Sequence, residues 1–160
     1  MTLSQKPAES DVLIRPAKLR DVGAVYRLEN LCFQADAWPW IDVLATLIFP
    51  ETVRLKAMRC GDLVGYVVGD RRRHVGLGWI ASIGVHPDHR RMGIGRQLLK
   101  TCEHELGMPR IRLTLRRSND HAMNLYLSDG YVPVDTWARY YRDGEDGIVM
   151  EKVVSEVQAK

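Results

Sequence analysis

Cysteine is scarce in this sequence. The three cysteines, Cys32, Cys60 and Cys102, are odd in number and lie far apart along the 160 residues. This excludes a disulfide framework and any CxxC metal or redox motif, and it fits the reducing cytoplasm. The histidines show no pair at metal-ligand spacing, so we predict no metal.

Long apolar runs and a strong charge are also missing. No stretch approaches the ~18 apolar residues of a membrane span, and the polar segment Met1–Ser10 has no signal-peptide core. We therefore expect a cytoplasmic protein without a membrane partner, with a flexible tail over residues 1–10 and one domain over residues 11–155. A net charge of +3 is too small to suggest a nucleic-acid partner, but it suits a small polyanionic ligand where arginines cluster.

Hydrophobic spacing predicts an α/β fold. The pattern predicts helices over Leu19–Phe33, Trp40–Phe49 and Gly95–Leu106, and a fourth helix capped by Ser118 or Asn119 and ending at Ser128. It predicts strands over Val12–Arg15, Val53–Arg59, Leu63–Val68, Trp79–Val85, Ile111–Leu115, Tyr131–Ala138 and Ile148–Val154. The order βααβββαβαββ implies a mixed central β-sheet with helices on both faces.

A basic, glycine-containing loop follows the expected strand Trp79–Val85. Its pattern is Arg90-x-x-Gly93-x-Gly95, placed between Val85-His86-Pro87 and a helix. A helix N-terminus offers unpaired N–H groups and a partial positive charge, and glycines let a phosphate approach the backbone closely. The Walker pattern is absent, and Leu98 replaces the third glycine of the dinucleotide fingerprint. The loop predicts a pyrophosphate cradle, with an ordinary glycine-rich turn as the alternative.

This loop resembles motif A of the GNAT superfamily of acetyl-CoA-dependent N-acyltransferases, and the expected element order matches the GNAT fold. The resemblance implies acetyl-CoA as co-substrate. It implies that the pyrophosphate is held by Arg90, Arg91, Met92, Gly93, Ile94, Gly95 and Arg96. It also implies that Ile83, Gly84 and Val85 pair with the pantetheine arm, and that a bulge there splays two strands to form the cleft.

Two segments in the second half resemble protein N-terminal acetyltransferases. Residues 118–126 match the pattern SN-x-x-A-x-x-LY, and residues 140–150 resemble YY-x-DGEDA-x-x-M, with Gly147 at the position of the alanine. Trp38-Pro39-Trp40 is similar to the aromatic-Pro-Trp segment of the bacterial group, which acetylates a ribosomal-protein alanine. The resemblance implies acetyl transfer to a protein N-terminal α-amine by direct attack of the amine on the thioester. The alternatives are a lysine side chain or small-molecule amine as acceptor, or a CoA-binding regulatory module with little catalysis.

The resemblance also assigns roles to single residues. Tyr126 stabilises the leaving thiolate, unless it is only a core tyrosine, and Asn119 binds pantetheine amides, caps the helix, or both. Tyr140 and Tyr141 wall the peptide groove, although strand alternation would let at most one of them face it. Trp38 shapes the pocket for the first substrate residue, or else anchors the second helix.

One position departs from the family pattern. The bacterial relatives carry a glutamate, the expected general base, in the segment L-E-V-R-x-S-N, whereas this chain has Thr114. Some relatives place a carboxylate in the loop between the first two helices. Asp36 lies in that loop and is therefore the candidate catalytic carboxylate in this chain. An α-amine has a pKa near 7.7–8.0, so roughly a tenth of it is neutral at pH 7, far more than of a lysine amine. A missing base therefore favours an α-amine acceptor.

Overall fold

The computed structural model describes residues 12–154. The expectations for residues 1–10, and for domain ends at residues 11 and 155, lie outside these residues. The strands are β1 (Val12–Pro16), β2 (Thr52–Arg59), β3 (Asp62–Arg72), β4 (Leu77–Val85), β5 (Arg110–Arg116), β6 (Val132–Trp137) and β7 (Gly147–Val153). The helices are α1 (Val22–Phe33), α2 (Trp40–Ile48), α3 (Ile94–Leu106) and α4 (Asp120–Ser128).

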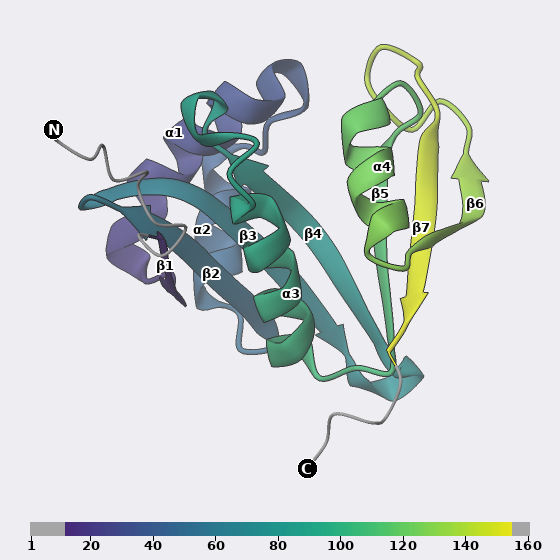
Figure 1. Ribbon diagram of the computed structural model, residues 1–160, viewed down its shortest axis with the longest axis horizontal. Helices are drawn as coiled ribbons and strands as arrows, with labels where there is room; N and C mark the ends of the chain where they lie inside the picture. Colours follow the sequence, from purple (N-terminus) through teal and green to yellow (C-terminus); the bar gives the residue numbers. More distant parts are fainter. Residues whose placement is uncertain (1–11, 155–160) are drawn as a thin grey trace, which may run out of the picture.

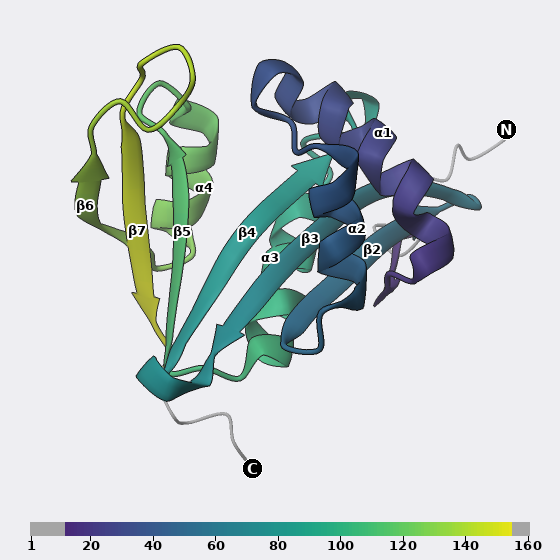
Figure 2. The ribbon, with the colours of Figure 1, turned by 180° about the vertical axis from the view of Figure 1, so that it is seen from behind.

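One seven-stranded sheet runs through the described residues in the order β1-β2-β3-β4-β5-β7-β6. Helices α3 and α4 cover one face of this sheet, and α1 and α2 cover the other (Figures 1 and 2). The element order βααβββαβαββ and the mixed sheet are as the sequence predicts.

Helix α3 packs its apolar stripe directly against the sheet. Leu98, Leu99, Cys102 and Leu106 are all buried. Gly69 of β3 permits this close approach, because a Cβ there would lie 2.8 Å from the Cys102 sulfur. Burial of such side chains stabilises the fold by about 1.5–3 kcal/mol each.

The sheet splits into two arms between β4 and β5. The parallel pairing of these strands covers only Leu77–Ile80 against Arg110–Leu113, and the strands then diverge (Figures 1 and 2). An irregularity in the β3–β4 register falls at Ala81, because Val68 pairs with Ser82 and Gly69 with Ile80. The prediction of a bulge at Ile83–Val85 was therefore wrong in position. Those residues pair regularly with β3, and the extra residue is Ala81, earlier in the strand.

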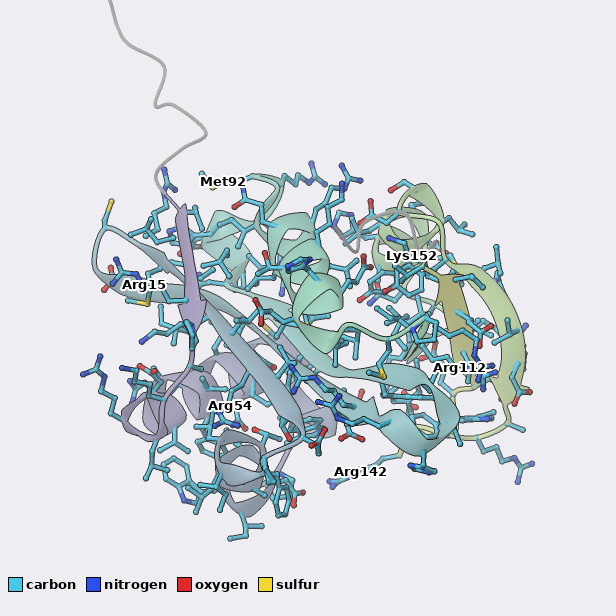
Figure 3. The ribbon with its side chains drawn as sticks, turned by 90° about the horizontal axis from the view of Figure 1, so that it is seen from below. Arg15, Arg54, Met92, Arg112, Arg142 and Lys152 are labelled. Carbon is cyan, nitrogen blue, oxygen red and sulfur yellow. The ribbon has the colours of Figure 1, made fainter. Side chains whose placement is uncertain are left out.

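Charged pairs join the two arms. Lys152 of β7 contacts Glu103 of α3 at 2.9 Å, and the buried Tyr131 donates a hydrogen bond to the same carboxylate at 2.7 Å. Arg112 pairs with Glu151 at 2.6 Å within the β5–β7 arm, where Figure 3 labels Arg112 and Lys152. The contacts of Glu103 with Lys152 and Tyr131 fix α3 relative to the second arm.

Several boundaries differ from the sequence prediction by one or two residues, and two differ by more. The first helix begins as a 3₁₀ turn over Leu19–Asp21, and α1 starts at Val22. Strand β3 continues to Arg72, beyond the expected end at Val68. The strand continues because Gly69–Arg72 pair with Leu77–Ile80 of β4. The Arg71 guanidinium donates to the carbonyls of Glu105 and Leu106 at 2.7 and 3.3 Å. A cation there also complements the negative C-terminal end of α3.

Candidate active site

A cavity of about 520 Å³ lies where β4 and β5 diverge. It brings together the predicted residues Asp36, Trp38, Ile83, Asn119, Tyr126, Tyr140 and Tyr141, together with Thr114. These side chains come from both arms of the sheet, from α4, and from the α1–α2 and β6–β7 loops. Gly84, Val85 and the predicted phosphate-binding residues 90–96 do not line it. A separate hollow of about 580 Å³, lined by residues of β1 and β2 among others, contains none of the predicted residues.

The predicted phosphate loop leads from the end of β4 into α3. Arg91 and Gly93 adopt positive φ angles of 61° and 78°, and Gly93 is the N-cap of α3. A Cβ at Gly93 would meet nothing within 4 Å, so the space beside this glycine is open. Met92 of the same loop, which is labelled in Figure 3, is 40% exposed. An accessible helix N-terminus with an open glycine fits a pyrophosphate group.

Two of the loop arginines have protein partners. Arg90 Nε donates to the Val85 carbonyl at 3.1 Å, which ties the loop to the end of β4. Arg96 contacts Asp129 at 3.1 Å and Ser128 Oγ at 2.9 Å. Arg96 therefore links the start of α3 to the end of α4 across the two arms.

Tyr126 lies on α4 and faces the cavity. The Asn119 side chain caps this helix by accepting a hydrogen bond from the Ala122 N–H at 3.1 Å, so its capping role is confirmed. Burial raises the pKa of Tyr126 to about 12. Full proton transfer to a thiolate with a pKa near 8.5 would then be uphill by roughly 5 kcal/mol. Tyr126 is suited to donating a hydrogen bond to developing negative charge.

Tyr140 and Tyr141 both line the cavity, so the expectation that only one faces it was wrong. Strand β6 ends at Trp137, and Arg139 has a positive φ of 52°. Both tyrosines therefore lie in the β6–β7 loop, where strand alternation does not apply. Their rings pack edge to face with centroids 5.1 Å apart, and the centroids of the Tyr140 and Trp137 rings are also 5.1 Å apart. Together these rings form an aromatic wall.

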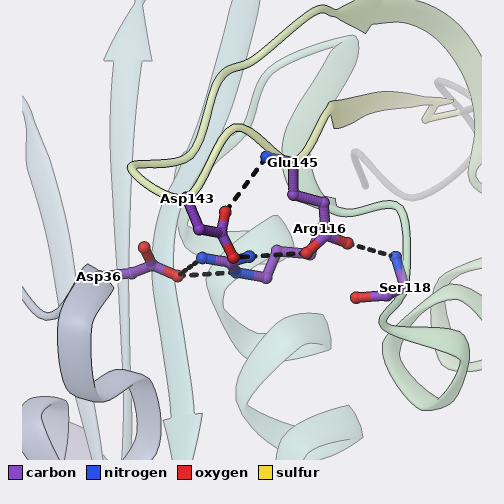
Figure 4. Close-up of polar contacts among 5 residues, drawn as sticks. All are labelled: Asp36, Arg116, Ser118, Asp143 and Glu145. Atoms are coloured by element: carbon purple, nitrogen blue, oxygen red, sulfur yellow. Dashed lines mark hydrogen bonds and ion pairs between the residues drawn. The ribbon is translucent and has the colours of Figure 1, made fainter.

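Arg116 connects three carboxylates beside the cavity (Figure 4). It contacts Asp36 at 2.6 Å, Asp143 at 2.8 Å and Glu145 at 2.6 Å, and its guanidinium lies 4.3 Å from the Tyr141 ring centroid. Arg116 holds the pKa of Asp143 below its usual value. Hydrogen bonds from Ser118 and Arg116 do the same for the pKa of Glu145. This cluster joins the α1–α2 loop to the β6–β7 loop.

The contact with Arg116 bears on Asp36, the predicted catalytic carboxylate. Its Oδ2 atom accepts from two guanidinium nitrogens at 2.6 and 2.7 Å. A proton arriving at that oxygen would have to displace the guanidinium. Asp36 thus anchors its loop in this structure, and its role as a base stays a prediction.

Sequence reasoning missed Glu29 and Ser82, which also line the cavity. The signal for Glu29 was available. It lies four residues after Val25 and three before Cys32, on the stripe of α1 that faces the sheet. A carboxylate on a buried stripe needs polar partners. Those partners come from β3 and β4, far away in sequence.

Within residues 12–154 no group of three or more His, Cys, Asp or Glu side chains is placed to hold a metal ion. Nor does this range contain a helix with the length and apolar character needed to cross a membrane.

Comparison with known proteins identifies the family. Residues 23–131 match the model of the acetyltransferase (GNAT) family. An uncharacterized N-acetyltransferase of Methanocaldococcus jannaschii is 32% identical, with 88% of this chain and 91% of that protein covered. The chain therefore belongs to the GNAT family, and it is an N-acetyltransferase.

Other relatives have more specific names. An N-alpha-acetyltransferase of Sulfurisphaera tokodaii is 28% identical, with 94% of this chain and 98% of that protein covered. The ribosomal-protein-S18-alanine N-acetyltransferase of Escherichia coli superposes with a TM-score of 0.83 at 25% identity, covering 93% of this chain and 97% of that one. The predicted resemblance to protein N-terminal acetyltransferases is thus confirmed at the level of the family.

Proposed function

We propose that this protein transfers the acetyl group of acetyl-CoA to the N-terminal α-amine of a protein, with a ribosomal protein as the model acceptor. The observation that carries the proposal is the bridge made by Arg116 between Asp36 and the pair Asp143 and Glu145. This bridge joins the two loops beside the cavity. The bridged loops close this side of the cavity. A chain end needs only one path into the cavity, whereas an internal segment needs a path in and a path out, so the bridge obstructs the internal segment more.

The donor side of the cleft is assigned to acetyl-CoA. The proposal places the pyrophosphate at the open N-terminus of α3, around Gly93 and Gly95, and the pantetheine arm along Ile83–Val85. Beyond Ile80 this edge of β4 has no β5 partner, which supports the assignment. Bound acetyl-CoA supplies the thioester that the acceptor amine attacks.

The acceptor side is assigned to the face with Trp38, Tyr140 and Tyr141. Arg116 and its three carboxylate partners carry a formal charge of −2, from one positive and three negative groups. Arg142 also lines the cavity, and with it the formal charge is −1. A negative field attracts an α-ammonium group towards the cavity. Aromatic walls also give a preformed surface for the first side chain. Tyr126, on α4 between the two sides, would hydrogen-bond the departing thiolate.

The cellular location is part of the same proposal. The thiols of Cys32, Cys60 and Cys102 are all unpaired. Free thiols persist in a reducing compartment. We therefore place the reaction in the cytoplasm.

Matched peptides test the acceptor. One peptide begins with a free alanine and contains no lysine, and its partner has a blocked N-terminus and one internal lysine. We expect acetyl-CoA turnover with the first peptide at least about tenfold faster at pH 7.5, given the larger neutral fraction of an α-amine. Faster turnover with the blocked peptide, or with a small-molecule amine, would assign the site to that acceptor instead.

A further inference from the structure

Glu29 is a buried residue that lines the cavity, and within residues 12–154 it has no cationic hydrogen-bond or ion-pair partner. It is 2% exposed. One carboxylate oxygen accepts hydrogen bonds from the Tyr66 hydroxyl and, at 3.0 Å, from the Ser82 hydroxyl. The other accepts from the Trp38 N–H at 3.1 Å. All three donors are neutral, so the negative charge is solvated by hydrogen bonds alone.

Among the residues that the structure describes, Glu29 and Asp36 alone contribute carboxylates to the cavity lining. Asp36 is bound to Arg116, whereas Glu29 contacts hydroxyl and amide groups. Ser82, the residue after the bulge at Ala81, lines the same cavity and contacts Glu29. A hydroxyl that donates to a carboxylate while facing a cavity can pass a proton inwards.

We propose that Glu29 accepts the proton of the attacking amine through the Ser82 hydroxyl, in place of the glutamate that Thr114 replaces. This inference rests on the proposed acetyl transfer and names its proton acceptor. The bound α-ammonium passes one proton to Ser82 as the Ser82 proton passes to Glu29. The neutral nitrogen then forms a bond to the thioester carbon, and the carbon–sulfur bond breaks with its electron pair going to sulfur. The second nitrogen proton goes to the thiolate, and Glu29 returns its proton to solvent.

Thr114 is not suited to accept the amine proton. Its hydroxyl is buried and has no hydrogen-bond partner, and a threonine hydroxyl does not ionise near neutral pH. Burial raises the pKa of Glu29 above its usual value, although hydrogen bonds from Trp38 and Ser82 oppose this shift. A general base works best when its pKa lies near the operating pH.

Other ionisable groups surround this network. Cys32 lies one turn further along α1, and burial raises the pKa of its thiol. Tyr66 approaches from β3 and is 2% exposed. The remaining titratable or charged groups of the cavity are Asp36, Arg116, Tyr126, Tyr140, Tyr141 and Arg142. A change in the pH profile must therefore be traced to Glu29 by substitution.

The test is the pH profile of kcat with a saturating α-amine peptide. In the wild type, kcat should level off below the pKa of the free amine, because the carboxylate removes the proton from the bound amine. In Glu29→Gln, we expect kcat at pH 6.5 to fall about a hundredfold, the usual range for a lost general base. At pH 9 the loss should be less than about tenfold, since the amine is then already neutral.

Two further variants separate chemistry from structure. Tyr66→Phe removes the hydroxyl that donates to the Glu29 carboxylate and also lies 2.9 Å from Ser82 Oγ. Because the carboxylate loses a donor, the rising limb of the pH profile should move to higher pH while the plateau is retained. Glu103→Gln is the matched control, because this glutamate also accepts from a tyrosine hydroxyl but does not line the cavity. Its profile should keep the wild-type shape.

A Glu29→Gln profile that matches the wild type in shape, with kcat lowered equally at every pH or not at all, would overturn the proton-acceptor role. A rising limb of the pH profile that does not shift in Tyr66→Phe would also overturn this role. Failure of the proposed function would look different, because the wild type itself would then leave the α-amine unacetylated.

Discussion

Arg116 on β5 and Asp36 in the loop after α1 are 80 positions apart in sequence, yet the guanidinium binds one carboxylate oxygen at 2.6 and 2.7 Å. The same guanidinium holds Asp143 and Glu145. The shape of the proposed acceptor side therefore depends on one side chain that reaches both loops. Because an arginine fork presents several donors in fixed directions, a lysine cannot replace all of these contacts.

Arg116→Lys should loosen the acceptor side selectively. We expect the KM for an α-amine peptide to rise about tenfold, equivalent to ~1.4 kcal/mol, with the Kd for acetyl-CoA unchanged. Steady-state kinetics and calorimetry measure the two quantities separately.

Arg117→Lys is the matched control for this variant. Arg117 is the next residue, is 60% exposed in its side chain, and pairs with Asp146 at 3.3 Å. An exposed pair of this kind contributes about 0–1 kcal/mol, so KM should stay within about threefold. Equal effects of the two substitutions on KM would show that the bridge does not shape the acceptor site.

The phosphate loop predicts a charge effect at Gly93. Gly93→Asp should abolish acetyl-CoA binding in calorimetry, because a carboxylate would lie beside the expected pyrophosphate. Gly93→Asn has almost the same size, and asparagine tolerates positive φ angles, so it should bind far more tightly than the aspartate variant. Equal binding by the two variants would remove the pyrophosphate from this loop.

Tyr126→Phe should lower kcat by more than about tenfold, or ~1.4 kcal/mol, because the hydroxyl is lost while the packing is kept. Tyr131→Phe is the control, since that buried tyrosine contacts the Tyr126 ring at 5.7 Å but bonds to Glu103. Its kcat should change less than about threefold. A Tyr126→Phe enzyme with wild-type kcat, under conditions where chemistry limits turnover, would leave Tyr126 with a packing role only.

Glu29 should also make stability depend on pH. Its pKa is raised in the folded protein, so the folded state holds the proton more tightly than the unfolded state. The free energy of unfolding then decreases as pH rises from the unfolded pKa, near 4.3, through the folded pKa. Glu29→Gln has no carboxyl group at this position and does not show this decrease. The free energy of unfolding of the variant should therefore rise relative to that of the wild type between pH 4.5 and pH 8. Denaturant titrations at both values test this, and a difference independent of pH would contradict the raised pKa.

The sequence predicts the order of elements well because the relevant signals are local. The stripe on α3 and the Asn119 cap of α4 each depend on residues within a few positions. The cavity depends instead on contacts between distant segments. Nothing near Glu29 in sequence indicates that Tyr66 and Ser82 will meet it, and strand alternation failed for Tyr140 and Tyr141 because a loop replaces the end of β6.

The central claim is that an N-terminal α-amine is the acceptor, and one peptide tests it directly. The peptide begins with a free alanine and carries an internal lysine, so both amines compete for acetyl-CoA in the same tube at pH 7.5. Fragmentation mass spectrometry then locates the added acetyl group. The account predicts acetylation at the α-amine, with the lysine unmodified at early times. Acetylation at the lysine while the α-amine stays free would contradict it.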